Sequence, residues 1–151
     1  MKSINNYITE KFKINSNNVK KYNYHPKDRD ELKKLIKKLI EEHGNEADLN
    51  DIDTSKITSM NSLFSDSDFN GDISQWDVSN VEDMNSMFAY SDFNGDISNW
   101  DVSKVENMER MFVYSIFNGD ISEWNVSNVK FMHDMFKKSP LENNPPKWYK
   151  E

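Results

Sequence analysis

One block of 24 residues recurs in this chain, and that recurrence limits what the chain can fold into. Phe69 to Asp92, Phe93 to Ile116 and Phe117 to Pro140 share the pattern Phe-Asn-Gly-Asp-Ile-Ser-x-Trp-[Asp/Asn]-Val-Ser-x-Val-x-x-Met-x-x-Met-Phe. A short unit repeated in register predicts a solenoid, whose coils bury their apolar side chains against one another. The shared positions therefore indicate packing, and function has to be sought in the positions that vary.

The repeat extends beyond its three clearest copies. Residues 45–68 align without a gap as a degenerate first copy, with Ile52 where the tryptophans stand, and Trp148 keeps the phase after Pro140. Pro145 and Pro146 stop further strand pairing. The predicted organisation is a leader or docking segment at 1–24, an N-terminal cap helix at 25–44, a four-coil solenoid at 45–140 and a C-terminal half-coil cap at 141–151.

Two periods follow each other within a block. Trp76, Asp77 and Val78 alternate as a short strand does, and Ser79 with Glu82 forms a Ser-x-x-Glu capping box. The apolar side chains that follow fall on one face of a helix: Val81, Met84, Met87 and Phe88. Asn-Gly pairs such as Asn70-Gly71 predict turns that use a positive φ. The expected fold is a right-handed α/β solenoid, like a leucine-rich repeat, with one short parallel strand and one short helix per coil.

The head of the chain predicts a separate helix. Residues 26–43 place five apolar side chains at helical spacing, begin with proline and acidic residues, and end at Gly44. Its lysines would suit a membrane-surface helix, but a cap over the first coil is favoured because a solenoid needs its ends covered. The segment before the Asn-rich break, residues 1–18, is interpreted as a docking peptide.

Charge divides the chain into a basic head and an acidic body. Residues 1–44 carry 11 Lys and Arg against 6 Asp and Glu, whereas residues 45–151 carry 8 against 20. An acidic body disfavours nucleic acid and anionic membranes as partners and favours basic protein surfaces, or simply solubility. No apolar signal segment or membrane span is evident, so a cytoplasmic or virion location is expected.

Aspartates recur at two positions of the repeat. One column is Asp48, Asp72, Asp96 and Asp120, and the other is Asp53, Asp77, Asp101 and Asn125. Such side chains most often cap turn amides, which is the favoured interpretation. The alternative is a Ca²⁺ site, because a hard cation needs several oxygen ligands.

The sequence contains no recognisable catalytic pattern. The chain has no cysteine, its three histidines are far apart, and its serines recur where turns and caps need hydroxyls. Neither a phosphate loop nor a nucleotide-binding pattern is present. The expected protein is not an enzyme and binds no cofactor.

Positions that vary between copies are the candidate contacts. They are Gln75, Asn99 and Glu123 beside the strand, and Tyr90, Tyr114 and Ile116 at the helix end. The edge formed by Tyr90, Tyr114 and Ile116 is the favoured binding patch, because interfaces are rich in such amphipathic anchors. The alternative is that the tyrosines only pack between adjacent coils.

The repeat resembles that of a known family. Residues 45–151 are similar to the BspA-type leucine-rich-repeat proteins, whose copies read Phe-Asn-x-Asp-Ile-Ser-x-Trp-Asp-Val-Ser-x-Val-x-x-Met-x-x-Met-Phe. The resemblance implies a secreted or surface protein used in adhesion and protein binding. Copies without an export signal, as here, look like those encoded by bacteriophages.

The leading hypothesis is a non-enzymatic module, phage-encoded or virion-associated, that presents a rigid acidic surface to an unidentified protein partner as a monomer or weak oligomer. A second hypothesis is an inhibitor whose acidic surface imitates nucleic acid in the basic groove of an enzyme. A third is an adhesive or structural surface protein.

Overall fold

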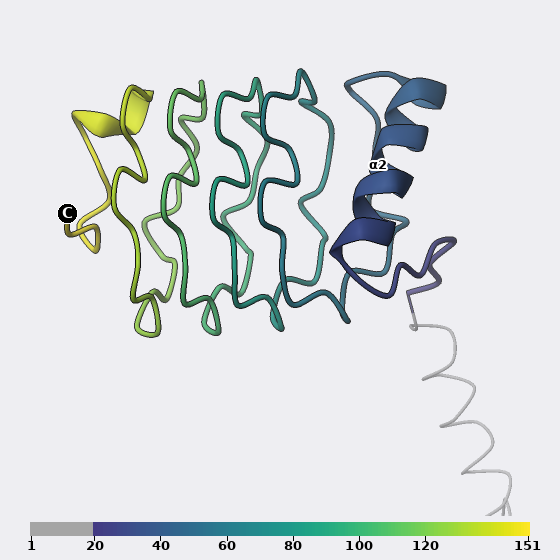
Figure 1. The fold of residues 1–151 in the computed structure, drawn as a ribbon, viewed down its shortest axis with the longest axis horizontal. Helices are drawn as coiled ribbons and strands as arrows, with labels where there is room; N and C mark the ends of the chain where they lie inside the picture. Colours follow the sequence, from purple (N-terminus) through teal and green to yellow (C-terminus); the bar gives the residue numbers. More distant parts are fainter. Residues whose placement is uncertain (1–19) are drawn as a thin grey trace, which may run out of the picture.

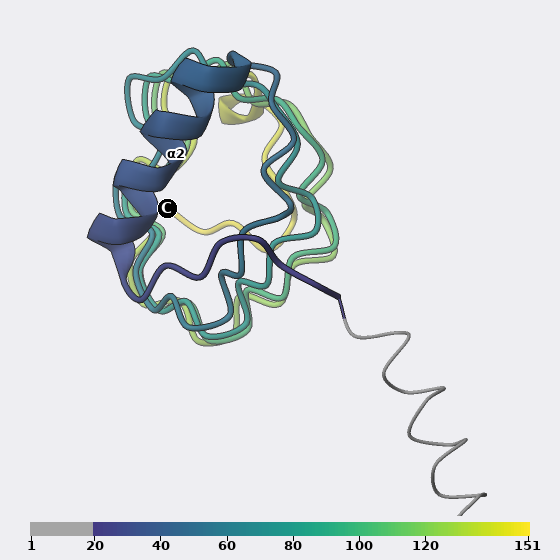
Figure 2. The same cartoon turned by 90° about the vertical axis from the view of Figure 1, so that its right-hand side faces the viewer.

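The computed structural model describes residues 20–151. The repeats lie side by side as coils stacked along one axis, with the helix α2 (Arg29–His43) across one end and the C-terminus at the other (Figure 1). Seen along that axis, the coils superpose as a loop around a common interior (Figure 2). We number them coil 1 to coil 4 for residues 45–68, 69–92, 93–116 and 117–140.

The predicted α/β class, with one strand and one helix in every coil, is wrong. Between residues 20 and 151 the structure has one α-helix, α2, and one short 3-10 helix, η1 (Pro140–Glu142). Neighbouring coils are joined by isolated parallel bridges and not by strands of a sheet. Each coil is built from consecutive tight turns instead.

Coil 2 shows why the spacing of the apolar residues led to the wrong prediction of a helix in each coil. Ser86 and Tyr90 have φ angles of 54° and 55°, a left-handed conformation that interrupts a right-handed helix. The N–H of Met87 bonds the carbonyl of Met84, so a turn brings buried side chains back every third residue, as a helix does. Ser79 begins no helix, because its N–H and hydroxyl both donate to Oδ1 of Asp77.

Backbone hydrogen bonds run from coil to coil. Alternate N–H groups of coil 2 donate to alternate carbonyls of coil 3 over 2.8 to 2.9 Å: Met84 to Asn107, Ser86 to Glu109, Phe88 to Met111 and Tyr90 to Val113. Each coil therefore satisfies the buried polar groups of its neighbour. Its stability depends on that neighbour, as in other repeat proteins.

Aromatic columns fill the interior. The expected inward position of the tryptophans is confirmed, since Trp76, Trp100 and Trp124 are 4–5% exposed. Each indole N–H donates to a carbonyl of the preceding coil, for example Trp100 to Ile73 at 3.2 Å. A second column, Phe64, Phe88, Phe112 and Phe136, stacks with ring centroids 5.6 to 5.8 Å apart.

The glycines of the Asn-Gly pairs have a different role from the one predicted. Among the glycines in the described chain, positive φ occurs at Gly44 and not at these turns. A Cβ added to Gly95 would lie 2.8 and 2.9 Å from ring carbons of Phe93. Glycine is therefore required by the close approach of the phenyl ring and not by backbone conformation.

Helix α2 begins and ends close to the predicted positions. Asp28 caps it by accepting the N–H groups of Asp30 and Glu31, and the N–H of Gly44 bonds the carbonyl of Ile40 at the other end. Its buried side chains, Leu32, Ile36 and Leu39, belong to the same apolar core as the coils.

The described part of the predicted leader packs on coil 1. Tyr24 forms a parallel bridge with Ile52, and its carbonyl accepts the N–H of Asp53 at 2.8 Å. The docking peptide predicted at residues 1–18 lies outside the described residues.

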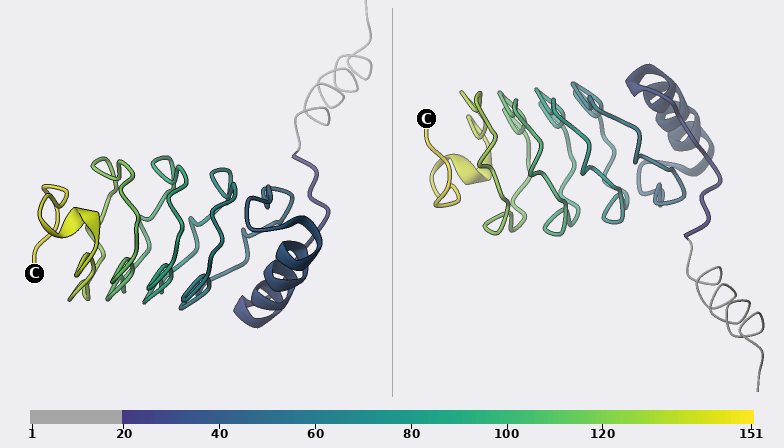
Figure 3. Two further views of the ribbon diagram at one scale, coloured as in Figure 1. Left: turned by 90° about the horizontal axis from the view of Figure 1, so that it is seen from above. Right: turned by 90° about the horizontal axis from the view of Figure 1, so that it is seen from below.

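The C-terminal tail, residues 141–151, folds over coil 4 (Figure 3). Trp148 stacks on Trp124 with centroids 6.4 Å apart, and its indole N–H donates to the carbonyl of Ile121 at 2.9 Å. Tyr149 meets Phe136 edge-on at 5.0 Å. The tail thus repeats the tryptophan contact of the coils at the far end of the stack.

Candidate protein-binding groove

Two positions in every coil have a left-handed backbone, with φ between 51° and 57°. Their side chains form two columns along the stack: Ser62, Ser86, Arg110 and Asp134, and Asp66, Tyr90, Tyr114 and Lys138. Residues of both columns line a shallow groove of about 490 Å³. Ala89 and Val113, which separate the two columns in sequence, are buried and also line it.

Tyr90 and Tyr114 form the aromatic side of this groove. Their rings stack with centroids 4.9 Å apart and planes 6° apart, yet 55% of Tyr90 and 49% of Tyr114 remain exposed. The tyrosines pack between coils, as the alternative interpretation expected, and both stay half-exposed, while their role as a binding patch remains a prediction. Stacking restricts the orientations that both exposed rings can adopt.

Charged groups lie along the groove. The Nε atom of Arg110 is 3.8 Å from a carboxylate oxygen of Glu109, a loose contact for a guanidinium that has five donors. Lys137 is paired with Asp134 at 3.2 Å, and Asp66 accepts the hydroxyl of Ser65 at 3.1 Å. The groove therefore combines aromatic edges, hydroxyl groups and a guanidinium, which together suit polar recognition around an apolar contact.

The remaining predicted contacts lie outside this groove. Ile116 is 52% exposed but does not line it, so the predicted Tyr90, Tyr114 and Ile116 edge is only partly brought together. Gln75, Asn99 and Glu123 are exposed side chains next to the buried tryptophans and do not line the groove either.

The sequence analysis did not identify Arg110 or the buried residues Ala89 and Val113 as part of a site. The signal for Arg110 was available, because the same repeat position holds serine in coils 1 and 2 and aspartate in coil 4. No sequence signal marked the groove itself, because serine, arginine and tyrosine seldom adopt positive φ.

The aspartate columns cap turns, as expected. Asp96 Oδ1 accepts the N–H and hydroxyl of Ser98 at 3.0 and 2.7 Å, and Asp101 Oδ1 accepts the N–H of Ser103 at 3.0 Å. The serine hydroxyls, followed by the serine N–H groups, lower the pKa of both carboxyls. Asn125 accepts the N–H of Ser127 in the same way at 3.1 Å, so the cap does not need a charge.

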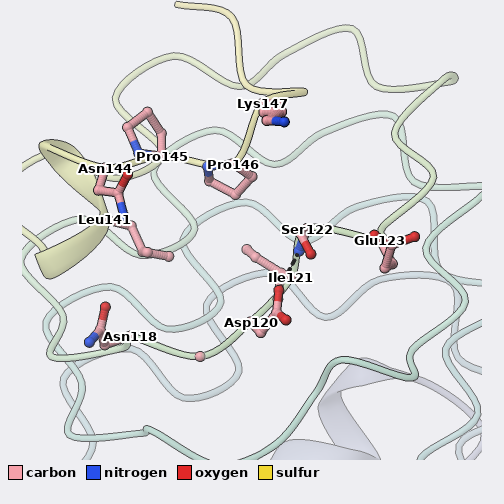
Figure 4. A pocket seen from close by; sticks show the side chains of 11 residues that line it. Asn118, Asp120, Ile121, Ser122, Glu123, Leu141, Asn144, Pro145, Pro146 and Lys147 are labelled. Carbon is pink, nitrogen blue, oxygen red and sulfur yellow. Dashed lines mark hydrogen bonds between the residues drawn. The ribbon is translucent and has the colours of Figure 1, made fainter.

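A hollow of about 550 Å³ lies between coil 4 and the tail (Figure 4). Pro145 and Pro146 face Ile121 and Ser122 across it, and Glu123 lies at its margin (Figure 4). Leu141 and Asn143 stand at the repeat positions that hold phenylalanine and glycine in coils 2 to 4.

Groups of three or more acidic or histidine side chains placed to hold a metal ion do not occur between residues 20 and 151. Over the same residues, no helix combines the length and apolar character needed to cross a bilayer.

The stacked 24-residue coils and their capping helix define a repeat protein. The family described as "Mycoplasma protein of unknown function, DUF285" matches residues 30–148, from the start of α2 to Trp148, and the chain belongs to this family. No match was found among curated proteins or among solved structures.

Proposed function

We propose that this protein is a non-enzymatic binding module that holds a partner protein in the groove beside Tyr90 and Tyr114. The observation that carries the proposal is the stacked and half-exposed tyrosine pair next to Arg110. Tyrosine and arginine are the residue types that dominate interface energetics. A pair fixed by stacking also loses little side-chain entropy when a partner binds.

Support for a rigid binding surface comes from the backbone beneath it. The N–H of Tyr90 donates to the carbonyl of Val113 at 2.9 Å, and the N–H of Tyr114 donates to that of Lys137 at 2.8 Å. Both tyrosines are therefore fixed to the next coil by their own backbone. A partner meets a preformed surface, which lowers the cost of association.

The test is capture of partners from the native host with the full chain and quantification by mass spectrometry. Replacing Tyr90 and Tyr114 together by serine is expected to reduce capture of specific partners at least about tenfold, the effect of losing a modest hot spot. Replacing Gln75 and Asn99 by serine changes two exposed polar residues outside the groove and is the matched control. Equal capture by both double variants would reject the groove as the binding site.

A second candidate function rests on the charge of the first two coils. Coil 1 carries six acidic side chains and one lysine, and coil 2 carries five acidic side chains and no basic one. We propose as the alternative that this surface occupies the basic groove of a nucleic-acid enzyme. Inhibition of such an enzyme would then weaken steeply with added salt, whereas salt-independent inhibition would reject mimicry.

The finer family assignment is also a proposal. We infer from the Phe-Asn-Gly-Asp-Ile-Ser-x-Trp repeat that the chain is a BspA-type repeat protein, phage-encoded and located in the cytoplasm or the virion, with an adhesive surface role as the alternative. Immunodetection in purified particles, in the host cytoplasm and on intact cells separates these locations.

A further inference from the structure

The end of the stack at coil 4 is only partly covered. Val126, Val129 and Met132 are partly exposed, whereas their counterparts in coil 3 are at most 1% exposed. The tail covers the other side of this end, where Trp148 and Tyr149 pack. Among the described residues 20–151, this apolar strip has no neighbour, while the opposite end of the stack is covered by α2.

Two backbone polar groups along this strip also lack a hydrogen-bond partner within residues 20–151. In coil 3 the carbonyl of Glu106 accepts the N–H of Lys130 at 2.7 Å, and the N–H of Met108 donates to the carbonyl of Phe131 at 2.7 Å. The equivalent groups of coil 4 are the carbonyl of Lys130 and the N–H of Met132. Within residues 20–151 neither has a hydrogen-bond partner. An acceptor and a donor two residues apart therefore face away from the stack.

The residue between those two groups departs from its column. The column is Ser59, Asp83, Asn107 and Phe131, linked by parallel bridges. In coils 1 to 3 the polar side chain caps its own turn, as Asp83 does by accepting the N–H of Asn85 at 2.9 Å. Phenylalanine cannot make that bond, and Phe131 is 58% exposed. Coil 4 has lost a turn cap and gained an exposed aromatic ring beside the unpaired backbone groups.

We propose that a second copy of this chain binds here, through an antiparallel bridge centred on Phe131 and its counterpart. The carbonyl of Lys130 accepts the N–H of Met132 of the other copy, and the reciprocal bond forms by symmetry. The two phenyl rings then lie directly opposite each other, a favourable cross-strand pair. Val129 and Met132 extend the apolar contact on both sides.

Charge and geometry favour a second copy in this orientation. Coil 4 carries three acidic and three basic side chains, so two such ends do not repel, unlike two copies of coil 2 with five acidic side chains and no basic one. A head-to-tail arrangement is blocked, because α2 covers coil 1 and the Nε atom of Arg29 already bonds the carbonyl of Asn61 at 2.8 Å. The contact is independent of the tyrosine groove, so either proposal can fail alone.

Cysteine cross-linking tests the two-fold axis directly, because the chain has no cysteine of its own. Residues opposite each other in such a bridge have Cα atoms about 4.5 Å apart, within the range that a disulfide spans. Phe131→Cys is expected to form a disulfide-linked dimer rapidly under mild oxidation. Ile116→Cys, another exposed apolar position, is the matched control. Equal cross-linking rates for the two variants would overturn the proposal.

Sedimentation of the full chain provides a second, non-covalent measurement. Phe131→Asp restores the residue that this column has in coil 2, and Ile116→Asp does the same for its own column. We expect the natural chain and Ile116→Asp to dimerise alike and Phe131→Asp to dimerise at least about tenfold more weakly. A cooperative thermal melt shows that Phe131→Asp is folded. A natural chain that stays monomeric at about 100 µM, or unchanged dimerisation of folded Phe131→Asp, contradicts the proposal.

Discussion

Trp100 illustrates how one side chain joins two coils. Its ring is buried, and its indole N–H donates to the carbonyl of Ile73 in the preceding coil. Burial supplies the hydrophobic contribution, and the indole adds a second hydrogen bond to a carbonyl that already accepts the N–H of Trp76.

Trp100→Ala is expected to lower the free energy of unfolding by about 3–5 kcal/mol, because it leaves a large cavity and removes a hydrogen bond between two coils. Urea unfolding followed by circular dichroism measures the change. Gln75→Ala, an exposed position next to a tryptophan, should change it by less than about 0.5 kcal/mol. A loss for Trp100→Ala no larger than that of the control would contradict the packing described here.

The lowered pKa of Asp101 makes stability depend on pH. Its carboxylate is favoured in the folded state by the Ser103 hydroxyl and N–H, so this stabilisation is present above the unfolded pKa of about 3.9 and is lost as pH falls through the lower folded pKa. Asp101→Asn keeps the acceptor but does not titrate. The natural chain should therefore be more stable than Asp101→Asn at pH 7, and the difference should vanish as pH falls from about 4 to about 2.

Urea midpoints of both proteins across this pH range measure the effect. A constant difference between Asp101→Asn and the natural chain would show that the cap does not favour the charged form.

Residue-level prediction from the sequence succeeded for burial and failed for backbone conformation. Trp76, Met84 and Phe88 were expected inside and are buried. The positive φ of Ser86 was not expected, because neither glycine nor asparagine marks the position. Repetition reveals which side chains face inward, but tight turns and a helix give the same spacing of three.

Among the elements, α2 was predictable because all of its signals are local. Asp28 accepts two N–H groups of the first turn, and Lys27, the residue before the cap, donates its N–H to a carboxylate oxygen of Glu31 at 2.9 Å. The coils combine short local turns with hydrogen bonds to residues about 24 positions away, such as that from the N–H of Ser86 to the carbonyl of Glu109. Local propensity cannot identify partners at that distance.

Asp28→Ala is expected to lower the free energy of unfolding by about 0.5–2 kcal/mol, the usual cost of losing an N-cap. Asp28→Asn keeps an acceptor oxygen and should lose less. Urea unfolding at pH 7 gives both values. Equal losses for alanine and asparagine would show that the carboxylate acts only through its charge on the helix.

On the scale of the whole molecule, neighbouring coils meet through nearly identical interfaces. Phe88 stacks on Phe64 and on Phe112 at the same centroid distance of 5.6 Å. One internal coil is thus a structural equivalent of another, and the stability of the stack is close to a sum over coils and their contacts.

Deleting residues 93–116 should therefore leave a folded but less stable protein. The deletion brings coil 2 against coil 4 with their aromatic columns in register and removes one interface. A single cooperative melt at a lower temperature is expected, whereas deleting residues 99–110, half a coil, should abolish the melt. Similar melts for the two deletions would show that the 24-residue period is unimportant for folding.

The tail contact at Trp148 sets a direction for unfolding. A full helix with three buried residues seals one end of the stack, whereas the other end is held by a few side chains around a single indole hydrogen bond. Local opening begins where the fewest contacts must break. The stack should therefore unfold locally from coil 4 toward coil 1. In an amide hydrogen-exchange measurement, amides around Met135 are expected to exchange before those around Met60.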